Sequence, residues 1–273
     1  MIKILFKFSI IKKITSSIMR RYFIFFKKKS TYYKIQGIEM FLNFLDPVDK
    51  EIILTKEYET RQINILINNI KKYHINYFID IGANCGYYSL LIAKNIQKIK
   101  VISFEPNIEA IKKFKKSLQK NFLLQKKIHL KEYGLANKNS KYLMRSLVKY
   151  GYAQSSGSSI EKYNNKSISN VIRYFAEFKR GDNQIKITKK IISVKIDVEG
   201  SEIDTLRGLK KILKENKIFL QIEIFNKNYN KVNNFLKKII SSQIIKLFQR
   251  AATQITIIKI ISINPKFNKR NIN

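Results

Sequence analysis

Two short stretches of the sequence carry side chains whose types and spacing could do chemistry. The first, Tyr77 to Leu90, reads YFIDIGANCGYYSL: a strand-like run ends at Asp80, a glycine turn follows, and then a helical pattern begins. Glycine has no Cβ, so the backbone of such a turn can bend sharply and approach a ligand closely. The order strand, glycine turn, helix is typical of a nucleotide-type site at the edge of an open α/β sheet.

The spacing of the glycines and one acid narrow the class of ligand. Gly82 and Gly86 form G-x-x-x-G, whereas dinucleotide-binding folds carry G-x-G-x-x-G. Asp80 stands where a pyrophosphate would be repelled. We therefore expect a cationic ligand without phosphate, with S-adenosylmethionine as the candidate cofactor. The alternative is an ordinary strand-to-helix turn that binds nothing.

A second strand-like run, residues 100–104, ends in Glu105-Pro106-Asn107. Pro106 disfavours helix at Glu105 and so marks the end of the strand, and Asn107 can cap the helix that follows. Glu105 lies roughly 20 residues after Gly86, the spacing expected of a ribose-binding acid. Its carboxylate could accept hydrogen bonds from both ribose hydroxyls; the alternative is a solvated surface charge. A third strand, residues 128–133, leads to Gly134 and Leu135, which we expect near the adenine.

The second chemical stretch is an acidic cluster after a strand, SVKIDVEGSE over residues 193–202. In a chain so rich in lysine, a run of charged residues that is merely exposed to solvent would be basic. We therefore expect this acidic cluster to have a specific role. Asp197 or Glu199 could act as general base toward a hydroxyl. Together with Glu223 they could instead hold a divalent cation such as Mg²⁺, which lowers the pKa of the hydroxyl. A third alternative is that Glu199 and Glu202 only favour the positive end of the next helix.

Alternating elements must position these residues. Apolar residues at Ile63, Leu66, Ile67 and Ile70 predict a helix over residues 57–72. Strand and helix patterns then alternate, and two strands near 244–248 and 255–263 close the chain. This order predicts a doubly wound, mostly parallel, seven-stranded α/β sheet with helices on both faces. Ligands bind at the carboxyl ends of such strands, where Asp80, Glu105, Asp197 and Glu223 are expected.

The net charge and the number of cysteines bear on which partners and which kinds of site are expected. The 273 residues carry 54 basic and 19 acidic side chains, a net charge of +35. Lys, Ile and Asn are abundant from end to end, so we interpret the charge as a chain-wide bias and do not expect nucleic acid as the partner. The single cysteine, Cys85, excludes an internal disulfide and a Cys-cluster zinc site, which suits a reducing cytoplasm.

Two segments lie outside this pattern. Residues 1–36 are basic and apolar, without the run of about 20 apolar residues that a membrane span needs and without the features of a secretory signal. We expect an N-terminal helical extension that packs on the main domain, residues 37–273. The alternative is an interfacial anchor that attaches a cytoplasmic protein peripherally to an anionic membrane. Residues 141–190, with a Gly/Ser run over 154–159, predict an insertion of short strands over the substrate mouth.

Three motifs, FIDIGANCGYYSL, ISFEPN and VKIDVEGSEIDTLRGL, together resemble FkbM-type methyltransferases, a branch of the class I S-adenosylmethionine-dependent enzymes. The resemblance covers roughly residues 77–225. It implies a Rossmann-like fold and O-methylation of a hydroxyl on a sugar, glycan or small natural-product acceptor. It also implies that the 195–202 motif lies beside the transferred methyl group. The candidate cofactor-binding residues are Asp80, Gly82, Ala83, Asn84, Gly86, Glu105, Pro106, Asn107, Gly134 and Leu135, and the catalytic candidates are Asp197 and Glu199.

Two alternative functions remain from the sequence. One is an RNA ribose 2′-O-methyltransferase, prompted by the charge. A cytosine-C5 methyltransferase would need a nucleophilic cysteine, and the only cysteine, Cys85, lies within the glycine turn, which speaks against this activity. The acids of residues 197–202 would also repel the phosphates of a nucleic acid. The other alternative is a non-catalytic basic binding protein on a methyltransferase scaffold.

Overall fold

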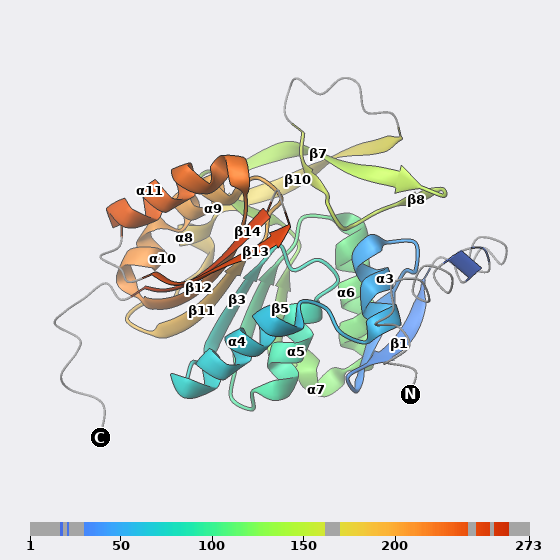
Figure 1. Cartoon of the computed structure of the whole chain (residues 1–273), viewed down its shortest axis with the longest axis horizontal. Coiled ribbons are helices and arrows are strands. Elements are labelled where there is room, and N and C mark those ends of the chain that lie inside the picture. Colours follow the sequence, from blue (N-terminus) through green and yellow to red (C-terminus); the bar gives the residue numbers. More distant parts are fainter. Residues whose placement is uncertain are drawn as a thin grey trace.

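A central, mostly parallel β-sheet organises the chain (Figure 1). The computed structural model describes residues 17–18, 21, 30–161 and 170–239, and the backbone of strands 244–251 and 254–261. In this described part, five neighbouring strands run parallel, and β14 runs antiparallel to both of its neighbours. The strands follow the order β13 (Ile244–Ala251), β14 (Gln254–Ile261), β12 (Lys217–Phe225), β11 (Ile191–Ile196), β3 (Tyr77–Ile81), β4 (Lys100–Phe104) and β5 (Ile128–Lys131).

Helices cover both faces of this sheet because its central strands are apolar on both sides. Phe78 of β3 packs in one buried cluster, with Leu66 and Phe114. Its neighbour Ile79 points to the opposite face and packs in a second cluster, with Leu206. The predicted doubly wound α/β architecture is confirmed. The helices of the first cluster include α4 (Thr60–Lys72), α5 (Tyr87–Asn95) and α6 (Ile108–Lys120), next to α7 (Phe122–Gln125), and residues 35–54 also contribute to it. The helices of the second cluster are α9 (Glu202–Gly208), α10 (Lys210–Glu215) and α11 (Tyr229–Ile239), with α8 (Gly181–Gln184) and the 3₁₀ helix η1 (Asn226–Asn228) beside them.

An N-terminal hairpin precedes the sheet. It consists of β1 (Thr31–Ile35) and β2 (Ile38–Leu42), and Phe41 N donates a hydrogen bond to Ser117 Oγ of α6 at 2.9 Å. Helix α3 (Pro47–Thr55) follows. The boundary expected after residue 36 therefore falls in the turn of this hairpin. The helical extension and the membrane contact predicted for residues 1–36 fall mostly outside the described residues, but residues 31–35 of this segment form strand β1 and not a helix. Within the described part no helix is long and apolar enough to cross a bilayer.

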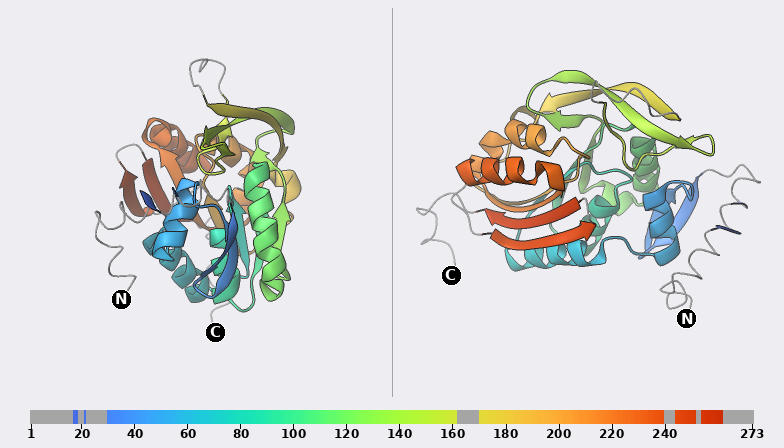
Figure 2. Two further views of the ribbon diagram at one scale, coloured as in Figure 1. Left: turned by 90° about the vertical axis from the view of Figure 1, so that its right-hand side faces the viewer. Right: turned by 45° about the horizontal axis from the view of Figure 1, so that its top comes forward.

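The predicted insertion and the preceding strand β6 form a second, mixed sheet, in which β10 pairs parallel to β6 and antiparallel to β7. This sheet crosses the carboxyl ends of the central strands (Figure 2). Two of its strands have ten residues each and pair with one another, so the expectation of short strands was wrong for them. The two strands pair although more than 20 residues separate them in the sequence. The sequence of either segment by itself does not predict this pairing. The strands are β6 (Gly134–Ala136), β7 (Ser140–Lys149), β8 (Tyr152–Ala153), β9 (Ser159–Ile160) and β10 (Val171–Arg180).

Gly86 lies at the start of α5, where α6 packs against the glycine turn. Its φ of +83° is in the left-handed region, and a Cβ at this position would stand 2.3 Å from the Phe114 ring. The glycine is thus required by conformation and by packing within the protein. Gly151, in the β7–β8 turn, has a φ of +67° but open space around its Cβ position.

We predict that Gly86→Ala lowers the free energy of unfolding by about 3 kcal/mol, the sum of left-handed backbone strain and overpacking. Gly151→Ala is the matched control and should lose only ~1 kcal/mol, because it meets strain without a clash. Urea denaturation followed by circular dichroism measures both values. Equal losses of unfolding free energy in the two variants would show that Phe114 moves aside without a loss of stability, and would contradict the prediction.

Candidate functional site

Backbone hydrogen bonds tie the carboxyl ends of three parallel strands together. Gly82 N and Ala83 N, just beyond β3, donate to Phe104 O of β4 at 3.0 and 3.1 Å, and Asp197 N, just beyond β11, donates to Ile81 O at 2.9 Å. A Cβ at Gly82 would stand 1.8 Å from the Asp197 carbonyl oxygen, so only glycine fits there. The glycine turn and the acids after β4 and β11 are consequently held at one edge of the sheet.

Glu105 lies at this edge, directly after β4. Its two carboxylate oxygens accept hydrogen bonds from Asn84 N and Asn107 N, both at 2.8 Å, and the residue is 6% exposed. Burial raises the pKa of Glu105 to about 7, although the two N–H donors oppose the rise. A carboxylate oxygen can accept a second hydrogen bond, so Glu105 retains the capacity to accept from two hydroxyl groups.

A cavity lies between this edge and the insertion, and we name it the Glu105 cavity. Its floor contains six of the residues predicted to bind the cofactor, and its roof comes from the β8–β9 segment and from β7 and β10. The predicted residues in its lining are Gly82, Asn84, Glu105, Pro106, Gly134 and Leu135, and the roof contributes Met144, residues 155–160 and Phe178. Sequence reasoning placed the insertion over the mouth and noted residues 155–159 as part of its Gly/Ser run, but it did not single out Met144, Ile160 or Phe178.

A second cavity adjoins the first, and we name it the Lys195 cavity. It extends toward α3 and α4, and its lining includes Val48, Tyr58, Ala83, Tyr88 and Lys195 together with Glu223. Both cavities share the residues Gly82, Asn84, Ser156, Gly157, Asp197 and Glu199. The predicted catalytic pair therefore stands where the two cavities meet.

Three of the predicted cofactor-binding residues line neither cavity. Asp80 is fully buried beneath the floor, where its carboxylate accepts a hydrogen bond from Ser89 Oγ at 2.6 Å; burial raises its pKa even though Lys195 opposes the change. Asn107 caps α6 by accepting from Ala110 N. Gly86 packs against Phe114, and the close approach to a ligand that its spacing predicted stays a prediction.

Lys195 is a buried cation that sequence reasoning missed. Its Nζ lies 3.2 Å from Asp197 Oδ2, 3.9 Å from Asp80 Oδ1 and 4.8 Å from the centre of the Tyr88 ring. Burial alone would lower the pKa of Lys195, but the two carboxylates outweigh burial and raise it. The ammonium group is therefore retained beside the side chain of Asp197, which is 28% exposed. A lysine within a mostly apolar strand was the signal that could have identified it.

The acids that follow β11 divide into two groups. Glu199 lies in both cavity walls and has a φ of +49°, a left-handed conformation that is uncommon for a non-glycine residue. Glu202 is buried at the start of α9 and accepts hydrogen bonds from Gly200 N at 2.6 Å and Asn228 Nδ2 at 3.1 Å. The helix-end role considered from the sequence thus describes Glu202, whereas Asp197 and Glu199 face the cavities.

The predicted metal ligands do not form a metal site. Asp197, Glu199 and Glu223 line the Lys195 cavity. Within residues 30–161 and 170–239, however, no three His, Cys, Asp or Glu side chains come together in a group that could hold a metal ion. The nearest cation partner of Asp197 in this region is the Lys195 ammonium. We therefore derive no step through a metal ion.

Comparisons with solved structures detected distant similarity to methyltransferases. FkbM from Methylobacillus flagellatus KT matches at 19% identity over 67% of this chain and 43% of that chain, with a TM-score of 0.46. Precorrin-6y C5,15-methyltransferase from Geobacter metallireducens matches at 10% identity over 75% and 90%, with a TM-score of 0.43. SMU.1697c from Streptococcus mutans, in complex with SAH, matches at 15% identity over 72% and 97%, with a TM-score of 0.44. The matched region spans less than half of the M. flagellatus protein, and TM-scores at this level carry no weight for the assignment.

The assignment rests on a family model. No curated protein matches the sequence. The model of the methyltransferase FkbM domain matches residues 80–249, which is more than half of the 273-residue chain. This range begins at the glycine turn and includes Glu105 and the acids after β11, the residues that the resemblance of the sequence motifs indicated. The chain belongs to the FkbM family of S-adenosylmethionine-dependent methyltransferases.

Proposed function

We propose that this chain transfers the methyl group of S-adenosylmethionine to a hydroxyl group of a sugar or small natural-product acceptor. The observation that supports it is the position of Asp197, at the junction of the Glu105 cavity with the Lys195 cavity. The cofactor would occupy the Glu105 cavity and the acceptor the Lys195 cavity. The hydroxyl would then meet the methyl group beside a carboxylate.

The residues of the Glu105 cavity fit the cofactor. Glu105 has unused acceptor capacity for the two ribose hydroxyls, and Gly134 with Leu135 offers a small, apolar edge for the adenine. Gly82 and Asn84 lie in both cavity walls, which supports a contact of these residues with the methionine end of the cofactor. In this proposal Asp80 and Asn107 support the floor of the site without touching the cofactor.

Asp197 accepts the proton of the hydroxyl in the proposed reaction. When bound, S-adenosylmethionine supplies an activated methyl group, so the protein has to align the acceptor oxygen and remove its proton. Lys195, at 3.2 Å, holds the Asp197 carboxylate in place through an ion pair. Glu199 stands in the same walls and is the second candidate for this role.

The charges of the Lys195 cavity support a neutral or cationic acceptor. Three carboxylates, of Asp197, Glu199 and Glu223, lie in its lining together with one ammonium group, of Lys195. A phosphate-bearing acceptor would meet these carboxylates on entry, and in a chain of net charge +35 an acidic lining is notable. We therefore favour a sugar or natural-product hydroxyl over an RNA ribose hydroxyl as the acceptor.

We predict that S-adenosylhomocysteine binds more weakly at pH 6 than at pH 8, by about tenfold. The pKa of Glu105 is about 7 in the cofactor-free protein. Raising the pH through this value therefore produces the carboxylate, which accepts hydrogen bonds from both ribose hydroxyls. Calorimetric titrations at both pH values measure the effect. Glu105→Gln should weaken binding and flatten this dependence; a dependence that persists in the variant would assign it to another group.

We predict that Asp197→Asn lowers methyl transfer by ~10²–10⁴-fold, the usual contribution of a general base, while the affinity for S-adenosylhomocysteine stays within about twofold. Glu199→Gln tests the second candidate in the same way. Asp204→Asn is the matched control, because Asp204 belongs to the same acidic stretch but lines neither cavity. The assay follows methyl transfer to a panel of sugars and natural-product alcohols. Full turnover in both test variants would remove these acids from the mechanism.

A further inference from the structure

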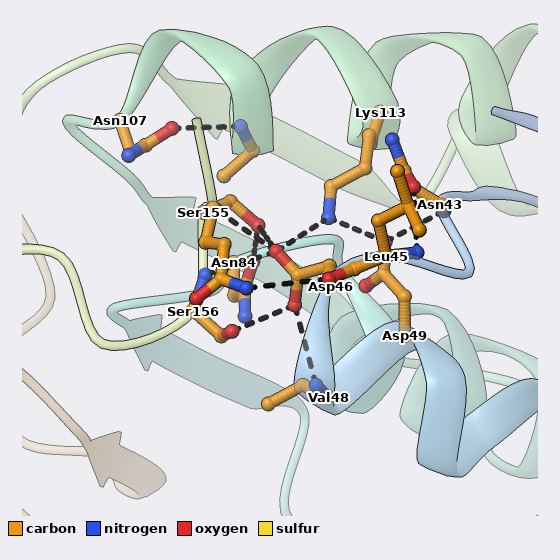
Figure 3. Close-up of polar contacts among 12 residues, drawn as sticks. Asn43, Leu45, Asp46, Val48, Asp49, Asn84, Asn107, Lys113, Ser155 and Ser156 are labelled. Carbon is orange, nitrogen blue, oxygen red and sulfur yellow. Dashed lines mark hydrogen bonds and ion pairs between the residues drawn. The ribbon is translucent and has the colours of Figure 1, made fainter. Parts of the chain in front are cut away.

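A second polar cluster takes no part in the proposed proton transfer (Figure 3). Three of its residues, Asn84, Ser155 and Ser156, line the Glu105 cavity. Its centre is Asp46, the residue that caps the N-terminus of α3 by accepting a hydrogen bond from Val48 N at 3.2 Å. The Asp46 side chain is completely buried. A helix cap needs only one of its oxygens, so the cap alone does not account for a fully buried carboxylate.

Further hydrogen bonds to the Asp46 side chain come from a segment 109 and 110 positions away in the sequence. Asp46 Oδ2 accepts from Ser155 N at 2.8 Å, from Ser155 Oγ at 3.0 Å and from Ser156 N at 3.2 Å. Asp46 Oδ1 accepts from Ser156 Oγ at 2.7 Å. The neighbouring Gln154 Nε2 donates to Leu45 O at 3.2 Å. One carboxylate thus gathers the N–H and O–H groups of two consecutive serines.

A buried lysine keeps this carboxylate ionised. Lys113 Nζ of α6 lies 3.6 Å from Asp46 Oδ2 and 2.5 Å from Asp49 Oδ2. Burial alone would raise the pKa of Asp46, but Lys113 and the serine donors outweigh burial and hold it below its usual range. Hydrogen bonds to an ionised acceptor are stronger than those to a neutral one, so the contacts with the serines are charge-assisted.

The gathered serines belong to the roof of the Glu105 cavity, whose lining includes residues 155–160. Ser155 Oγ also lies 2.9 Å from Asn84 Oδ1. Because the hydroxyl has a single hydrogen, it donates either to Asp46 or to Asn84, while the Ser155 N–H bond to Asp46 holds the residue in both cases. Asn84 N donates to Glu105. The contacts therefore run from Asp46 through Ser155 and Asn84 to Glu105. At the far end of the roof, Asn107 Nδ2 donates to Ser158 Oγ at 2.8 Å, so residues 155–158 are held at both ends.

We propose that Asp46 is a positioning residue for the cofactor: it holds residues 154–159 as a wall of the Glu105 cavity and, through Ser155, orients the side chain of Asn84. This inference rests on the proposed function in one respect, that the Glu105 cavity binds the cofactor. Asp46 lines neither cavity and acts only through the serines.

The test compares Asp46→Asn with Asp49→Asn. Both substitutions remove one carboxylate charge from Lys113, but only Asp46 contacts the serine segment, whereas Asp49 accepts from Asn43 N. Asparagine caps helices about as well as aspartate, so α3 keeps its cap in Asp46→Asn. Two quantities are measured on the full chain: the affinity for S-adenosylhomocysteine by calorimetry, and amide hydrogen exchange of residues 154–159 by mass spectrometry.

We expect Asp46→Asn to weaken binding by about tenfold, the scale of one or two lost charged hydrogen bonds, and to accelerate exchange in residues 154–159. Asp49→Asn should leave both quantities close to wild type. Wild-type binding by Asp46→Asn, or equal weakening in the two variants, would overturn the inference. Should Asp46→Asn fail to fold, Ser156→Ala replaces it, since its half-buried hydroxyl points to Asp46 Oδ1; faster exchange with weaker binding then supports the inference, and unchanged values refute it.

A different result marks failure of the proposed function. If wild-type protein does not bind S-adenosylhomocysteine, the cavity assignment is wrong. The exchange comparison between Asp46→Asn and Asp49→Asn needs no ligand, so it still shows whether Asp46 holds the segment.

Discussion

The arrangement of the site depends on the backbone contact between the glycine turn after β3 and the end of β11. Gly82 stands so close to the Asp197 carbonyl that a Cβ would lie 1.8 Å from it, and Asp197 N in turn bonds to Ile81 O. Parallel strands deliver their carboxyl ends to one edge of a sheet. This contact removes the remaining freedom at that edge, so the turn, Glu105 and Asp197 have fixed relative positions before any ligand arrives.

Buried charges surround this edge, and each is compensated within the protein. Lys195 is balanced by Asp80 and Asp197 beneath one cavity, and Lys113 is balanced by Asp46 and Asp49 beside the other. Ionised groups in an apolar interior are costly unless they are paired and hydrogen-bonded. Both clusters adjoin the glycine turn, because Asp80 lies near the end of β3 and Ser155, which Asp46 contacts, also contacts Asn84 within the turn.

The insertion covers the cavity at the carboxyl ends of the parallel strands. A doubly wound sheet exposes the carboxyl ends of its strands, and here β7, β10 and the segment between β8 and β9 cover them. The chain-wide excess of lysine does not extend to this interior: Glu105, Asp197, Glu199 and Glu223 lie in the cavity walls, and Lys195 is the one lysine or arginine among their described lining residues. The local field of the site is therefore set by its own residues and not by the net charge.

The sequence by itself determined the order of the elements, the glycine turn, and the positions of Glu105 and Asp197 at strand ends. These follow from local rules: side-chain periodicity, turn chemistry and the spacing between one strand and the next. Only the tertiary structure decided that Asp80 lies beneath the floor, that Lys195 pairs with Asp197, that β7 pairs with β10 along ten-residue strands, and that Asp46 gathers Ser155 and Ser156. Those features depend on contacts between segments that are distant in the chain, or on the depth of burial of a polar group. A local pattern records which face of an element is apolar, but it does not record which distant segment covers that face.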